Sequence, residues 1–168
     1  ATVTGGTVTA TDLTVNAASG SEEAAGGSKA KAVAGYSAGD FGLGGAIAVN
    51  VYSAKTRAYV DNTELSVSGN INISASDYSD SETIGTAVCD KTDVNQGQKG
   101  VGVGAGIALG ITGNTVEAYL GENVSFTNNN VGGMSVTASS QGNTNVEAQA
   151  GAAGGTAVAP VIALAVTT

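Results

Sequence analysis

The chain has no histidine and only one cysteine, which excludes several kinds of reaction centre. Without histidine there is no Ser-His or Cys-His pair for nucleophilic catalysis and no imidazole to bind a metal. A single cysteine, Cys89, forms neither an internal disulfide nor a four-thiolate zinc site. We expect Cys89 to be a small, partly buried hydrophobic residue. The alternative is a thiol that links two chains.

Cations and aromatic residues are also scarce. Six Lys and Arg stand against 14 Asp and Glu, and the net charge is −8, so the clustered cations that nucleic acids or anionic membranes require are missing. Aromatic residues make up 4% of the chain and Trp is absent. The longest apolar stretch, 101–111, is too short and too rich in glycine to cross a bilayer. We predict neither a nucleic-acid partner nor membrane insertion.

Two stretches, 41–51 and 101–111, follow the same alternating pattern. Apolar residues, bulky except at Gly45 and Ala105, occupy every second position, and Gly, Ala or Asn occupies the positions between them. Since side chains alternate between the two faces of a strand, each stretch predicts a strand with one bulky apolar face and one nearly bare face. We expect successive copies to bury one another's bulky stripe.

The bare face admits two interpretations. Glycine within a strand costs stability unless another group approaches closely, and Gly102, Gly104 and Gly106 stand at alternate positions. One interpretation is that a second sheet of the same molecule packs against this face at short range. The other is that the face is a flat surface exposed for a partner.

Landmarks recur along the chain at a nearly constant spacing. The tripeptide 47–49 returns in similar form at 107–109 and again at 162–164, while 13–17 resembles 71–75. Single matches of this length arise by chance, but their shared order indicates an internal repeat of about 60 residues. We expect a segment of a longer polypeptide, divided into the end of one repeat (1–40), two repeats (41–100 and 101–155) and the start of another (156–168).

Gly, Thr, Asn, Ser and Val are poor helix formers, and no apolar residues recur at helical spacing, so an all-β chain is predicted. A repeat β-solenoid, similar to a parallel β-helix, is the first choice, with tandem antiparallel β-sandwich repeats as the alternative. Three coils of about twenty residues would fill one repeat. The long strands instead fit either a wider solenoid or antiparallel strands joined by turns such as 112–114.

Acidic residues offer the only chemistry available for catalysis. A glycosidase needs two carboxylates across a cleft, but these acids fall mostly in predicted turns and nothing in the sequence frames a cleft. We interpret them as solvated charges that keep the apolar stack soluble. The groups concerned are Glu22 with Glu23; Asp77, Asp80 and Glu82; Asp90 with Asp93; and Glu117 with Glu122.

Calcium is the one cofactor for which the sequence offers candidate ligands. Asp90, Asp93 and Asn95 place three oxygen-bearing side chains close together, and 77–82 holds more, but neither spacing matches an EF-hand or a calcium-binding nonapeptide repeat. The first three residues are weak calcium candidates. No catalytic residue and no other cofactor is predicted.

The order of landmarks resembles the repeats of very large bacterial secreted adhesins, which include leukotoxin-type filamentous adhesins and autotransporter passenger regions. The pattern is a Gly-rich strand, Ile-Ala-Val/Leu-x-Val/Ile, then Ala-Tyr-Val/Leu, then Val/Ile-x-Ala-Ser. The residues that carry it are 41–60, 71–76, 101–120, 134–139 and 161–166.

The resemblance implies a β-solenoid stalk at the bacterial cell surface or outside the cell, which holds a binding tip away from the envelope. Its partners would be neighbouring repeats and a host-surface protein or glycan. Two alternatives remain open. One is a self-assembling filament joined end to end through strands 2–4 and 161–166, and the other is a polysaccharide-acting β-helix enzyme.

Overall fold

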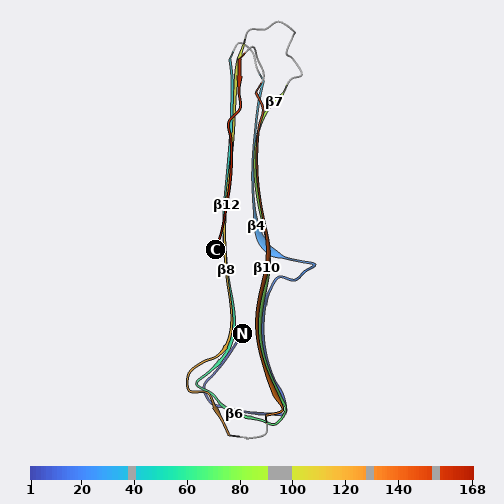
Figure 1. Ribbon diagram of the computed structural model, residues 1–168, viewed down its shortest axis with the longest axis vertical. Coiled ribbons are helices and arrows are strands. Elements are labelled where there is room, and N and C mark those ends of the chain that lie inside the picture. The colour runs from blue at the N-terminus through green and yellow to red at the C-terminus, as the bar shows by residue number, and fades with distance from the viewer. Residues whose placement is uncertain (38–40, 91–99, 128–130, 153–155) are drawn as a thin grey trace. The chain divides into compact units, whose positions relative to one another are not determined.

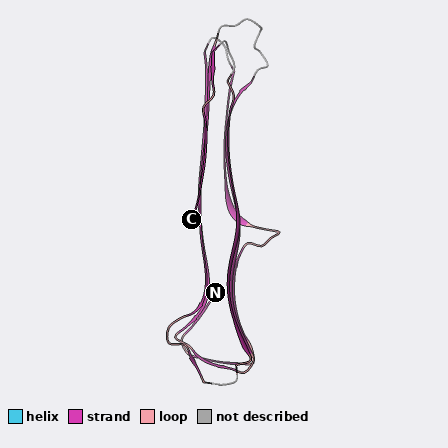
Figure 2. Ribbon diagram, in the orientation of Figure 1, coloured by secondary structure: helices cyan, strands magenta, loops and turns pink. Residues whose placement is uncertain are grey.

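The computed structural model of the chain describes residues 1–37, 41–90, 100–127, 131–152 and 156–168. Every regular element in these ranges is a strand, as Figure 2 shows, so the all-β prediction is confirmed. None of the described residues belongs to a helix long and apolar enough to cross a membrane. The strands in chain order (Figure 1) are β1 (Thr2–Thr4), β2 (Thr7–Ala10), β3 (Leu13–Ser19), β4 (Gly26–Ser37), β5 (Phe41–Asp61), β6 (Glu64–Val67), β7 (Asn70–Asp90), β8 (Val101–Leu120), β9 (Ser125–Phe126), β10 (Gly133–Ala150), β11 (Thr156–Val158) and β12 (Val161–Thr167).

The strands form three sheets. The first has the order β1-β5-β8-β11 with β12 also on β8, the second has β10-β7-β3 with β4 also on β7, and the third has β2-β6-β9. The pairs β1–β5, β2–β6, β3–β7, β6–β9, β8–β11 and β8–β12 are all parallel. Sheets in which each strand lies in register beside its counterpart from the next coil make a parallel β-solenoid, and these pairs do not fit antiparallel sandwiches.

The register of the strands reproduces the repeat seen in the sequence. Leu13 pairs with Ile71 where β3 meets β7, and Ile107 pairs with Ile162 where β8 meets β12. The same residues correspond to each other in the internal repeat of the sequence, where 13–17 resembles 71–75 and 107–109 resembles 162–164. Each sequence repeat therefore stacks directly on the next, residue against equivalent residue.

One coil takes up a whole repeat, so the expectation of three short coils is wrong. The strands β5, β6 and β7 follow one another around a single coil, and the hydrogen-bonded neighbour of each lies in the next coil. The turn expected at 112–114 is also wrong, because β8 runs unbroken through these residues. β5 likewise continues through 53–55. Of the two arrangements expected for the long strands, the structure has the wider solenoid.

The chain divides into two compact units. The long strands β5, β7, β8 and β10 each contribute residues to both units. Unit 1 consists of Ala1–Gly26, Ser53–Ser79 and Gly113–Gly142, and unit 2 of Gly27–Tyr52, Asp80–Thr112 and Asn143–Thr168.

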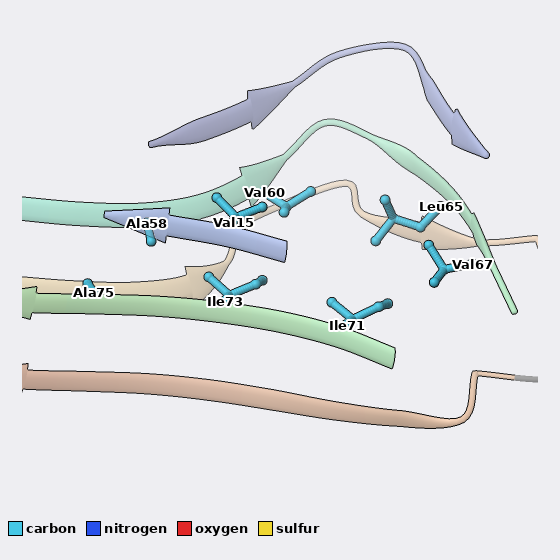
Figure 3. Close-up of a cluster of buried hydrophobic side chains, with 8 residues drawn as sticks. All are labelled: Val15, Ala58, Val60, Leu65, Val67, Ile71, Ile73 and Ala75. Atoms are coloured by element: carbon cyan, nitrogen blue, oxygen red, sulfur yellow. The ribbon is translucent and has the colours of Figure 1, made fainter. Parts of the chain in front are cut away.

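Unit 1 has an ordinary aliphatic core. Alternate residues of β3, β5, β6 and β7 point into it, so the strand period of two places one apolar face of each strand inside. Figure 3 shows how these side chains converge from the four strands. Burying each large aliphatic side chain contributes about 1.5–3 kcal/mol. The core residues are Val15, Ala58, Val60, Leu65, Val67, Ile71, Ile73 and Ala75.

Unit 2 has the opposite arrangement. The small residues of β5 and β8 point inward, with Ala46, Ala48 and Ala108 buried, while the bulky residues between them point outward. Ile47, for example, is 66% exposed. The expectation that successive copies bury the bulky stripe is therefore wrong for this unit.

The small residues are inside unit 2 because the two facing sheets approach each other closely. A Cβ atom added at Gly104 or Gly106 of β8 would collide with backbone carbonyl oxygens from the segment that includes β10, and one added at Gly85 of β7 would collide with the Ile107 carbonyl oxygen. Even the methyl group of alanine has no space at these positions. The interpretation of the bare face as packed against a second sheet is confirmed.

Candidate functional site

Asn50 is a buried polar side chain of unit 2 with hydrogen-bond partners on two other strands. It lies on β5 and is 6% exposed. Its amide nitrogen donates to the Ser28 carbonyl oxygen at 2.9 Å, to Ser81 Oγ at 3.0 Å and to the Glu82 carbonyl oxygen at 3.3 Å. Its Oδ1 accepts a hydrogen bond from Ser28 Oγ at 2.6 Å. One amide thus joins β4, β5 and β7, which is a structural role.

Replacing Asn50 with alanine should lower the free energy of unfolding by about 2–3 kcal/mol, because buried polar partners would lose their hydrogen bonds. Urea denaturation followed by circular dichroism measures this change. Asn145, an exposed residue of β10, is the matched position, and Asn145→Ala should change the free energy by less than about 0.5 kcal/mol. Equal effects of the two substitutions would contradict a clamping role for Asn50.

Asp77 and Asn114 form a buried polar pair in unit 1. Asp77 on β7 is 0% exposed, and Asn114 on β8 donates to Asp77 Oδ2 at 2.8 Å and to Ser79 Oγ at 2.5 Å. Among the residues described, no partner is found for Asp77 Oδ1 or for Asn114 Oδ1. Asp77 is the one acidic residue among the buried side chains of the described ranges. No second buried carboxylate therefore accompanies it as a general acid or base there.

The other acidic candidates are spread over the surface. Asp80 is exposed and accepts a hydrogen bond from Asn143, and Glu82 pairs with Lys29 at 3.2 Å. Glu117 forms an ion pair with Arg57, the residue sixty positions earlier. The loop residues Glu22 and Glu23 and the turn residue Glu122 are exposed.

The expectation that the acids lie mostly in turns is wrong for five of them. The acids that lie within long strands are Asp77, Asp80, Glu82, Asp90 and Glu117. Asp77 faces inward, and the ion pairs of Glu82 and Glu117 leave these two carboxylates held by cations on strands of their own sheets.

The weak calcium candidates lie almost entirely outside the described part of the chain. Asp93 and Asn95 are not among the described residues, and Asp90 is the last residue of β7, with its side chain not described. Within the described ranges, no three Asp, Glu, Cys or His side chains gather as they would around a metal ion. The calcium site therefore stays a prediction. The side chain of Cys89 is likewise not described.

The outer face of β5, β8, β11 and β12 in unit 2 is apolar except at Thr156. It consists of alternate residues of 41–51, 101–111, 156–158 and 162–166, and none of them is charged. We call this surface the outer apolar face. Phe41, Leu43, Ile47 and Val51 are each about two thirds exposed.

The opposite outer face of unit 2, formed by β4, β7 and β10, is mostly polar, and Val33, Ile84 and Val88 are apolar residues within it. Lys29 and Lys31 project from β4, Asp80 and Glu82 from β7, and Asn145 from β10. The two outer faces of one unit thus differ sharply in polarity. The sequence pattern identifies the bulky stripe but predicts that it lies inside unit 2. Asn50 and Thr112 share a face with the glycines, and both are buried, so the glycine face is the inner one.

A comparison of the chain with protein-family models, with curated proteins and with solved structures found no match. Function therefore has to be inferred from the geometry of the chain itself.

Proposed function

We propose that this chain is a structural and adhesive repeat segment of a large bacterial surface or secreted protein, in which it serves as a stalk or binding scaffold. The stacking of equivalent side chains in successive coils carries the proposal. In unit 1 the rings of Tyr59 and Tyr119, sixty residues apart, stack in parallel with centroids 4.9 Å apart and an interplanar angle of 2°. Each coil is thus a template for the next, as in repeat proteins that act as scaffolds.

The corners of the coil repeat in the same way. Asn62 and Asn123 both have a positive φ, 48° and 53°, and Asn123 Nδ2 donates to Asn62 Oδ1 at 2.9 Å. Asparagine tolerates this left-handed conformation better than most residues. In the preceding coil the corner between β1 and β2 is made by Gly5 and Gly6, which also have positive φ. Conserving a corner from coil to coil is what extends a solenoid in one direction.

The partners that fit this proposal are neighbouring repeats of the same polypeptide and a host-surface protein or glycan, and the location that fits it is outside the cell. A second candidate is a filament subunit that joins end to end through strands 2–4 and 161–166, which pair with β5 and β8. For a polysaccharide-acting enzyme, the described acids offer no comparable support, since they are buried singly, held by cations or spread over the surface.

Inserting a second copy of residues 41–100 directly after residue 100 tests the stalk. The longer chain should unfold in one transition, with a higher free energy of unfolding and a denaturant m-value raised roughly in proportion to its length. The control receives the same sixty residues in scrambled order at the same place. Unchanged stability and m-value in the duplicated chain, or an equal gain in the scrambled one, would overturn the proposal.

A further inference from the structure

The outer apolar face of unit 2 lacks a partner among the described residues, and its polarity sets it apart from the rest of that unit. Val49 at its centre is 54% exposed, and Ile162 and Leu164 on the neighbouring β12 are 58% and 52% exposed. Apolar residues scattered singly over a surface are normal, but a continuous uncharged sheet face marks an interaction site.

We propose that this face is the interface of a homodimer, in which two copies of the chain pack their outer apolar faces against each other. A twofold axis brings the same patch of both copies together, so an interface of this kind has to be self-complementary. An uncharged, apolar sheet face meets that condition, because no group on it repels its own image. Two such faces would pack about 10 Å apart, as in a β-sandwich.

The area of the face supports a dimer. Three strands about 4.8 Å apart and eleven residues long, at about 3.3 Å per residue, cover about 500 Å² in flat projection. Pairing two copies removes about 1,000 Å², which reaches the area that a specific interface needs, and projecting side chains add to it. The fully buried centre of a homodimer interface is usually more apolar than the remaining surface, as this face is.

Charge permits this occupant at the face itself. Each copy carries a net charge of −8, so two copies repel at long range, yet none of the residues that make up the outer apolar face is charged. Added salt screens this repulsion and leaves apolar burial intact. The dimer should therefore become tighter as NaCl rises from about 50 mM to about 500 mM.

Sedimentation velocity over a range of concentrations of the 168-residue chain tests the proposal. The wild-type chain should sediment as monomer and dimer in rapid or slow exchange. Val49→Glu and Ile162→Glu each place a charge in the face and should weaken the dimer about 100-fold or more, because a charge buried in an apolar interface has no partner. Circular dichroism establishes that both variants keep the fold.

Val33→Glu is the matched control. Val33 lies on β4 in the polar outer face of the same unit, is 63% exposed, and undergoes the same change of side chain. Its dimer should equal that of the wild type. The proposal is overturned if the wild-type chain stays monomeric at about 100 μM or floats with phosphatidylcholine vesicles as a monomer. It is also overturned if association survives both Val49→Glu and Ile162→Glu, as end-to-end joining would.

The dimer and the stalk can fail independently. The stalk depends on how stability grows with the number of repeats, whereas the dimer depends on a change of mass that point substitutions on one face abolish. A monomer whose stability grows with the number of repeats would contradict the dimer proposal and support the stalk proposal.

Discussion

Gly106→Ala should lower the free energy of unfolding by about 2–3 kcal/mol, an effect far larger than its single added methyl group would suggest. Gly106 lies on β8 and faces the second sheet of unit 2. A Cβ atom there would overlap the backbone carbonyl oxygen of Gln149 and would also lie 3.2 Å from the Gly85 carbonyl oxygen. Both groups belong to backbone, so neither rotates away. The two sheets would have to separate locally, which breaks contacts on both sides of the new methyl group.

Gly45→Ala is the matched control for this experiment. Gly45 lies on β5 in the neighbouring, hydrogen-bonded strand, but it faces outward, and a Cβ atom there would meet nothing closer than 4.0 Å. Removing a strand glycine without a clash should leave stability unchanged or raise it by up to about 1 kcal/mol, since alanine restricts the unfolded chain. Urea denaturation of both variants gives the difference. Similar losses at Gly106 and Gly45 would show that the sheets of unit 2 are not in close contact.

The coil register was the part of the fold that the sequence predicted best. Ladders in a solenoid bring equivalent residues together, so a repeat in the sequence is at the same time a list of neighbours in space. The match of 13–17 with 71–75 is for this reason the pairing of β3 with β7. Strand lengths were less accessible, because small residues such as Ser53 and Gly113 suggest a turn even where pairing between β5 and β8 of neighbouring coils keeps the strands extended.

The orientation of the long strands could not be predicted, because alternation shows that two faces differ but not which one is inside. The rule that large apolar residues are buried selects the bulky face. That rule holds in unit 1, where Val60 and Ile71 are fully buried, and fails in unit 2, where the space between the sheets holds mainly Gly, Ala and small polar side chains, with Val146 opposite Gly110. The spacing between two sheets is a tertiary property, and no local pattern encodes it directly.

The buried polar side chains were predicted least well. Closeness in the sequence groups Asp77 with Asp80 and Glu82 as acidic surface residues, yet the period of two in a strand places Asp77 on the opposite face from these two. In the sequence, Asn50 stands out only as a small residue of the bare face. A buried amide is valuable when partners surround it, and those partners come from β4 and β7, which no sequence pattern linked to Asn50.

Ile73→Ala and Ile47→Ala should separate the two kinds of interior by a direct comparison of the same substitution. Ile73 is 1% exposed in the core of unit 1, and its truncation should cost about 3–4 kcal/mol, from lost burial and the cavity left behind. Ile47 is 66% exposed on the outer apolar face of unit 2, and its truncation should cost less than about 1 kcal/mol, mainly through weaker strand propensity.

Both variants are measured by urea denaturation at about 1 μM protein, a concentration chosen to keep the copies apart, so that the dimer interface does not contribute to the result for Ile47. The wild-type midpoint should not change on tenfold dilution, which verifies that condition. If the bulky stripe were instead the core of unit 2, Ile47→Ala would be as destabilising as Ile73→Ala. A loss of about 3 kcal/mol in the free energy of unfolding for Ile47→Ala would show that the bulky stripe lies inside unit 2, and the dimer would then have no apolar surface to form on.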